Sequence, residues 1–148
     1  MIKQKMIIEC SAEDFFNEIV LGLKEQYKSL KGEYPTQDIQ EGFSFKVKLK
    51  KKDEVVGKGV YRVLKYDYPY HYCLEYTSHR FYKIVSAELE PIDETHAQLL
   101  FGEFSEKLKD GKKPKPTGED KIINAKLMTK LSVRKMVKSA KQREKEAL

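Results

Sequence analysis

Apolar and polar residues alternate strictly from residue 43 to residue 50. The apolar positions are 43, 45, 47 and 49, and a serine and three lysines occupy the others. Successive side chains of a strand point to opposite faces, so this pattern predicts a strand with one buried and one solvated face. A charged turn at 50–53 follows, and residues 55–66 predict the returning strand of a hairpin. Gly57 and Gly59 indicate a bulge or a bend in that second strand.

Four further stretches have strand character, namely residues 2–8, 71–77, 81–90 and 95–104. In the stretch 71–77, Tyr72, Leu74 and Tyr76 share one face, and the residues between them share the other. Turns that contain proline, at 67–70 and 91–94, join consecutive strands. Short turns of this kind predict an antiparallel meander.

A helix is predicted from residue 12 to about residue 29. Ser11 is a suitable N-cap, and Glu13 and Asp14 place negative charge in the first turn, where the helix dipole favours it. Apolar residues then recur at helical spacing; they are Phe15, Phe16, Ile19, Val20, Leu23 and Tyr27.

A second, longer helix is predicted for about residues 119–148, and we expect it to cover the apolar face of the sheet. At 100° per residue its apolar side chains fall on two nearly opposite faces. One face carries Ile123, Leu127 and Leu131, and the other carries Val133, Met136, Val137 and Ala140. The first face is expected to close the sheet. The helix then either bends near residue 132 or offers the second face to a partner, such as another copy of the chain.

The length of 148 residues fits a single domain. We divide it into a body of sheet and first helix at 1–106, a flexible basic connector at 107–119 rich in proline, glycine and lysine, and the C-terminal helix at 120–148. No apolar run suits a membrane span and the N-terminus does not resemble a signal peptide, so a cytoplasmic location is predicted. Cys10 and Cys73 are far apart and give no disulfide framework.

The chain lacks the common catalytic and phosphate-binding motifs, including a Gly-rich phosphate loop, a Gly-x-Ser-x-Gly elbow and His-Glu-x-x-His. No catalytic residue is therefore selected, although acid–base catalysis by Asp67, His71 or Glu75 in a pocket is left open. His71, Cys73 and Glu75 alternate along one strand with His79 beyond them, but the close ligand pair of a metal site is absent. No metal and no cofactor is predicted.

The order of strand, helix, antiparallel meander and long C-terminal helix resembles the helix-grip fold of the START-like (SRPBCC) superfamily. Residues Ile8–Phe16 are similar to the entry of that superfamily, and the segments 57–63 and 74–78 are similar to its middle strands. Over its whole length the chain resembles the uncharacterised bacterial domain-of-unknown-function family 3284. The capped first helix, Tyr66–Pro69 and Gly118–Lys121 carry this second resemblance.

The resemblance implies an α+β fold in which an antiparallel curved sheet of about six strands wraps around the C-terminal helix, with a helix after the first strand. It also implies a cavity between sheet and C-terminal helix that in many relatives holds an apolar small molecule. It transfers no catalytic residue, because the superfamily has no shared catalytic motif.

Tyrosines suit the lining of such a cavity, since a buried phenol presents an apolar ring and one hydrogen-bonding tip. The candidate ligand-binding residues are Phe43, Phe45, Val47, Tyr61, Val63, Tyr72, Leu74, Tyr76, Leu99, Phe101, Ile123, Leu127 and Leu131. A fully packed core without a cavity explains the same composition, and the sequence does not separate the two.

The positive charge is concentrated at the C-terminal end. Residues 1–106 hold 15 basic and 18 acidic residues, whereas residues 107–148 hold 14 and 5, which gives net charges of −3 and +9. The candidate partner-binding residues are Lys126, Lys130, Arg134, Lys138 and Lys141. The same run is also explained as a solvated helix face. This quarter has no Phe, Tyr or Trp, so nucleic acid and membrane are the less favoured partners.

The leading prediction is therefore non-enzymatic binding of an apolar or amphipathic small molecule in the cavity. The alternative is an interaction module whose basic helix contacts an acidic protein, nucleic acid or membrane surface, with a homodimer through the second half of that helix as one form. A cyclase- or hydratase-like enzyme comes third.

Overall fold

Six strands and two helices make up the computed structural model, which describes residues 3–108 and 126–147. In chain order they are β1 (Gln4–Ile8), α1 (Ala12–Lys31), β2 (Ser44–Lys51), β3 (Glu54–Asp67), β4 (His71–Ser78), β5 (Phe81–Pro91), β6 (Ala97–Lys107) and α2 (Lys126–Ala147). The side chains of residues 49, 51, 55, 56, 126–130 and 147 fall outside this description.

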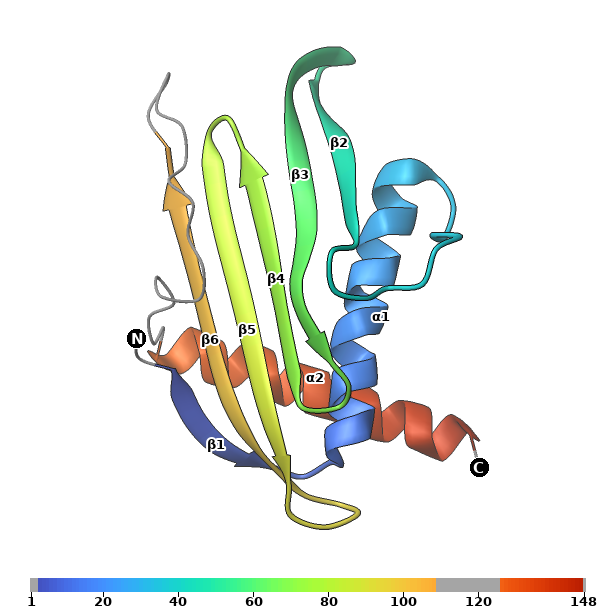
Figure 1. Cartoon of the computed structure of the whole chain (residues 1–148), viewed down its shortest axis with the longest axis vertical. Helices are drawn as coiled ribbons and strands as arrows, with labels where there is room; N and C mark the ends of the chain where they lie inside the picture. Colours follow the sequence, from blue (N-terminus) through green and yellow to red (C-terminus); the bar gives the residue numbers. More distant parts are fainter. Residues whose placement is uncertain (1–2, 109–125, 148) are drawn as a thin grey trace.

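The strands form one antiparallel sheet in the order β1-β6-β5-β4-β3-β2. Consecutive hairpins build the meander from β2 to β6, and β1 joins it by pairing with β6, Met6 lying opposite Leu99. The sheet curves, and both helices lie on one side of it (Figure 1). We call the side that the helices cover the inner face. The predicted α+β helix-grip arrangement is confirmed.

The register collects the predicted apolar residues on the inner face. Phe45 lies opposite Tyr61, which in turn lies opposite Tyr76. On β4 the alternation is as predicted, because Tyr72 belongs to the main core while Cys73 is buried in a second, smaller cluster on the outer face with Tyr82 and Ile84. The structure therefore buries apolar side chains on both faces of β4 and β5.

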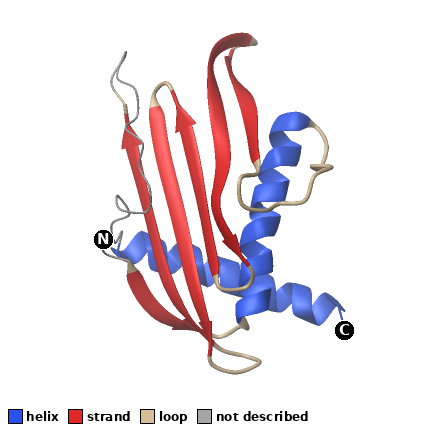
Figure 2. Ribbon diagram, in the orientation of Figure 1, coloured by secondary structure: helices blue, strands red, loops and turns tan. Residues whose placement is uncertain are grey.

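Helix α1 begins and ends at recognisable caps. The Asp14 N–H donates to the Ser11 hydroxyl at 3.1 Å, and Gly32 closes the helix at φ 84°, a left-handed conformation that glycine adopts without strain. This cap places the end at Lys31, two residues beyond the predicted one. The helix runs roughly along the strands beside β2 and β3 (Figure 2).

Helix α2 crosses behind the strands and passes α1 (Figure 1), and its buried face is the one that the sequence analysis left for a partner. Val133 and Ala140 are 2% and 4% exposed and belong to the main core, whereas Leu131 is 43% exposed. The prediction that Leu131 faces the sheet is wrong. Ile123 and the Leu127 side chain lie outside the described part of the chain.

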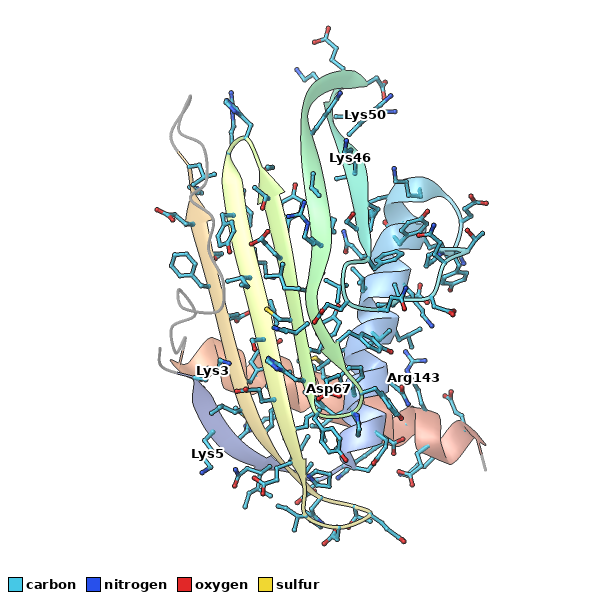
Figure 3. The ribbon with its side chains drawn as sticks, in the orientation of Figure 1. Lys3, Lys5, Lys46, Lys50, Asp67 and Arg143 are labelled. Atoms are coloured by element: carbon cyan, nitrogen blue, oxygen red, sulfur yellow. The ribbon has the colours of Figure 1, made fainter. Side chains whose placement is uncertain are left out.

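Two ion pairs accompany this rotation of α2. The Arg143 guanidinium donates to Glu18 of α1 at 2.7 Å, and the Lys141 ammonium lies 2.9 Å from Glu9 beside β1. Figure 3 shows Arg143 beside α1, near the point where α2 crosses it. With its apolar stripe held inside the fold, the second half of α2 loses the free apolar face on which the homodimer prediction rested.

The predicted connector begins later than expected. Residues 105–107 continue β6, because Lys107 still pairs with Phe81 across the ladder. Residues 109–119, the rest of the predicted connector, lie outside the described residues. Neither α1 nor the described α2 has the length and apolar character needed to span a membrane. The cytoplasmic location stays a prediction.

Candidate ligand-binding cavity

A cavity of about 420 Å³ lies between α1 and the inner face of the sheet. This volume is within the range of small-molecule sites. Helix α1 contributes Ile19, Gly22, Leu23 and Gln26, and the sheet contributes Tyr61, Tyr72, Leu74, Tyr76, Phe81, Lys83 and Val85. We call this space the α1 cavity.

Local structure explains why these side chains meet. On α1 the lining positions recur every three or four residues and therefore share one helix face. On the sheet, Tyr61, Tyr76 and Lys83 form one row across three strands, since Tyr76 is the cross-strand partner of both others. Leu74 and Val85 form the next row.

Two glycines shape the walls. Gly22 lies in the middle of α1, and a Cβ built on it meets no atom within 4 Å, so the missing side chain leaves space at the helical wall. At Gly59 the opposite holds, because a Cβ there would lie 2.6 Å from the Tyr76 hydroxyl and 2.8 Å from the ring. Only glycine lets the Tyr76 ring lie over the β3 backbone.

Packed aromatic rings hold the tyrosines of the wall in place. The Tyr61 ring stacks on Phe45 with centroids 4.9 Å apart and an interplanar angle of 12°. The Tyr61 ring also contacts the Tyr76 ring, with centroids 4.6 Å apart. The Tyr76 ring in turn contacts Phe81, with centroids 6.3 Å apart. Such contacts contribute beyond simple burial and restrict ring motion, so this wall is preformed.

The hydroxyls of Tyr61 and Tyr72 are neutral hydrogen-bonding groups. Burial raises the pKa of Tyr61, the neighbouring Tyr76 adds to the rise, and the hydrogen bond with Gln26 opposes it. Burial likewise raises the pKa of Tyr72, with smaller contributions from Cys73 and Tyr66. Both phenols therefore keep their protons at physiological pH.

The Tyr72 hydroxyl is the most informative atom of the site. Tyr72 is 1% exposed, and its buried hydroxyl oxygen has no hydrogen-bond partner among the residues that the structure describes. A buried polar group left without a partner costs about 1–3 kcal/mol. A polar atom of a molecule bound in the cavity would remove that cost once the side chains that cover the oxygen move aside.

Lys83 brings the single charged side chain to the described lining of the α1 cavity. It is exposed, whereas Val85, Ala87 and Leu89, which follow it on the inner face of β5, are half-buried or buried. The ammonium group therefore stands at the solvent end of the cavity. Glu103 of β6 lies opposite Val85, one row along the inner face from Lys83.

Four of the predicted ligand-binding residues line the cavity, namely Tyr61, Tyr72, Leu74 and Tyr76. Six others are buried in the main core without lining it: Phe43, Phe45, Val47, Val63, Leu99 and Phe101. The described helical wall comes from α1 rather than from the C-terminal helix.

The sequence analysis placed Ile19 and Leu23 on the buried stripe of the first helix but did not select them as lining. It also missed Gly22, Gln26, Phe81, Lys83 and Val85. Two interruptions of the apolar pattern could have indicated the cavity lining. They are Gly22 within the helical stripe and Lys83 on the inner face of β5.

The residues weighed for metal binding or catalysis lie away from the cavity. No group of three or more His, Cys, Asp or Glu in residues 3–108 and 126–147 is arranged to hold a metal ion. Glu75 accepts a hydrogen bond from the Tyr82 hydroxyl at 3.1 Å on the outer face, and Cys73 is fully buried there. Asp67, His71 and Glu75 are absent from the described lining.

The predicted partner-binding residues lie on α2. Arg134, Lys138 and Lys141 are exposed there, whereas the side chains of Lys126 and Lys130 are not described.

Comparisons with known proteins agree with this architecture. Residues 2–127 match the family model described as Domain of unknown function (DUF3284). Ara h 8.0201 is similar in structure, with 12% identity over 95% of this chain and 94% of that chain and a TM-score of 0.52. This likeness confirms the predicted START-like helix-grip fold and extends to the fold alone.

Two bacterial structures are more distant in shape. A conserved protein from Geobacillus kaustophilus is 16% identical over 95% of this chain and 91% of that chain, with a TM-score of 0.47. A START superfamily protein from Mycobacterium smegmatis is 11% identical over 99% and 97%, with a TM-score of 0.41. No curated protein sequence matches the chain.

Proposed function

Because the chain belongs to the DUF3284 family, whose description assigns no activity, we propose from the cavity itself that the protein binds an amphipathic small molecule without transforming it. The observation that carries this proposal is the buried Tyr72 hydroxyl, which lacks a described partner in the wall of a cavity of ligand size. In a packed core without a ligand, phenylalanine at this position would cost no stability, because no hydrogen bond of the hydroxyl would be lost.

The lining also supports a particular form of ligand. Ile19, Leu23, Leu74 and Val85 provide apolar contacts for a hydrocarbon or ring body. Tyr72 and Gln26 offer hydrogen bonds within the wall, and Lys83 at the solvent end favours a negative charge there. An apolar molecule with an acidic outer end satisfies all three features.

Binding is favoured over the cyclase- or hydratase-like alternative by what the wall contains. No carboxylate and no imidazole appears in the described lining, and burial raises the pKa of Tyr61 and of Tyr72 further above the ordinary value of a phenol. Acid–base catalysis requires a group that changes protonation near the working pH.

Replacing Tyr72 with phenylalanine tests whether the buried hydroxyl lacks a hydrogen-bond partner. In the absence of ligand, the Tyr72→Phe variant is expected to be more stable than wild type. Its free energy of unfolding should be about 1 kcal/mol higher, because an unsatisfied buried hydroxyl is removed. Urea unfolding followed by circular dichroism measures this. A loss of stability in the ligand-free protein would show that the hydroxyl is already satisfied and would remove the main support for the proposal.

Lys83→Met tests the charge at the outer end, with decanoate and decanol as probes of equal chain length. Decanoate affinity is expected to fall about threefold and decanol affinity to stay unchanged, since an exposed ion pair contributes well under 1 kcal/mol. Isothermal titration calorimetry measures both. Lys58→Met, on an exposed lysine of β3, is the matched control. Equal losses for both probes, or an equal effect at Lys58, would argue against an acidic ligand.

A further inference from the structure

A second groove, of about 550 Å³, runs between strand β1 and helix α2. Four consecutive residues of the β1 segment, 6–9, line one side, although alternate side chains of a strand point to opposite faces. Consecutive residues share a groove only where it follows the free edge of the strand. We call it the β1-edge groove.

The sheet topology leaves this edge available for pairing. β1 is an outer strand of the six, bonded on one side to β6. Ile7 in this strand is 68% exposed, the highest value among the exposed large hydrophobic side chains of the described residues. An edge strand presents a row of backbone donors and acceptors that another extended chain can complete.

The two edges of the sheet differ in how well they are protected. The opposite edge strand, β2, has four lysines among its eight residues, and Lys46 and Lys50 lie along it in Figure 3. Lysine on an edge disfavours the addition of another strand. Lys5 of β1 and Lys3, which comes just before the strand, precede the groove, and residues 6–9 contain no lysine.

The opposite wall of the groove is apolar and basic. One face of α2 supplies Val133 and Val137 together with Arg134, Lys138 and Lys141. Lys141 is neutralised by Glu9 at 2.9 Å, and this contact holds the pKa of Glu9 below its ordinary value. Arg134 and Lys138 then leave the groove with a net positive charge.

We infer that the β1-edge groove binds an extended segment of an acidic partner protein, which adds to the sheet as a strand beside β1. Its backbone pairs with β1, its apolar side chains lie on the outer face of the sheet beside the exposed Ile7, and its carboxylates lie on the inner face toward Arg134 and Lys138. This combination of main-chain pairing and side-chain pockets is a recurrent mode of peptide recognition.

Charge and shape favour this occupant over others. The chain's own segment 109–125 carries five lysines and three acidic residues, so it has the same sign as the groove. No aromatic residue lines the described groove to stack on nucleic-acid bases. A flat lipid surface would meet the cations of α2 but would leave the backbone edge of β1 unused.

The test uses the full chain and an acetylated, amidated peptide, Glu-Val-Glu-Val-Glu-Val-Glu. It is expected to bind, more weakly at higher salt, and to shift the backbone amide NMR signals of residues 6–9. Two N-methylated versions of the peptide, one methylated on its odd and one on its even residues, are compared. The version whose methyl groups face β1 cannot complete the strand pairing and is expected to lose binding, while the other keeps it. Binding of both versions as tight as that of the unmodified peptide would overturn the inference.

Matched charge reversals locate the site. Arg134→Glu with Lys138→Glu is expected to weaken peptide affinity about tenfold, since two charge pairs become repulsive. Lys135→Glu with Lys145→Glu changes the net charge equally on exposed positions of α2 outside the groove, and is expected to have little effect.

Three results would contradict the inference. These are equal losses in both double variants, a protein that binds anionic phospholipid vesicles or an oligonucleotide but not the peptide, and a dimer that pairs β1 with β1 and is unaffected by the peptide.

Discussion

Gly22→Trp is expected to reduce decanoate affinity by about tenfold or more while the protein folds as before. The new indole starts from a position where a Cβ meets nothing within 4 Å and fills the space between α1 and the tyrosine wall. A ligand cannot share that volume, because protein interiors tolerate no overlap of this size. Isothermal titration calorimetry and circular dichroism measure affinity and folding on the same samples.

Gly22→Ala is the control for this result. Its methyl group leaves most of the cavity open, so decanoate binding is expected to persist. Because glycine is unfavourable inside a helix, the alanine variant is also expected to be about 0.5–1 kcal/mol more stable than wild type. A tryptophan variant that binds decanoate as tightly as wild type would place the binding site elsewhere.

Phe16→Ala is expected to lower the free energy of unfolding by about 3–5 kcal/mol, the usual cost of deleting a large buried ring. Phe16 is fully buried where α1 meets the sheet, and its ring makes edge contacts with Tyr66, Tyr68 and Tyr72 at centroid distances of 5.1, 5.1 and 5.8 Å. The cavity left by alanine therefore loosens three rings at once. Urea unfolding measures the change.

Tyr70→Ala provides the comparison, since this aromatic side chain is 51% exposed and its loss is expected to cost under about 1 kcal/mol. Because the Phe16 ring contacts Tyr72 of the cavity wall, the folded fraction of Phe16→Ala is expected to bind decanoate more weakly than wild type. A stability loss at Phe16 no larger than that at Tyr70 would mean that this aromatic cluster does not hold α1 on the sheet.

The sheet could be predicted from the sequence because its signals are local. The alternation at 43–50 gave β2 within one residue at each end, and the proline-containing turns separated the later strands as observed. Ser11 fixed the start of α1 through its own hydroxyl. Such features depend on neighbouring residues only, so no knowledge of the rest of the fold was needed.

The rotation of α2 could not be predicted in the same way. Its sequence contains two opposite apolar stripes, and helical periodicity alone does not say which of them meets the body. Contacts with remote residues decide it, including Arg143 with Glu18 and Lys141 with Glu9. The described helical wall of the cavity comes from α1, and two of the lining residues predicted on the C-terminal helix, Ile123 and the Leu127 side chain, lie outside the described part of the chain.

The cavity was predicted in part, and the missing part has a physical explanation. Hydrophobicity identified Tyr61, Tyr72, Leu74 and Tyr76, but an apolar side chain has the same pattern whether it fills a core or lines a space. Part of the space lies where Gly22 has no side chain. The sequence alone does not show that this position faces the sheet, because that depends on how α1 packs on it.

The most direct test of the central claim is a methyl NMR titration of the full chain with decanoate. We predict that shifts concentrate on Ile19, Leu23, Leu74 and Val85, which line the α1 cavity, while Leu64 and Ile84 of the outer-face cluster stay unchanged. Shifts confined to the outer face or to the β1-edge groove, or no shifts at saturating decanoate, would contradict it.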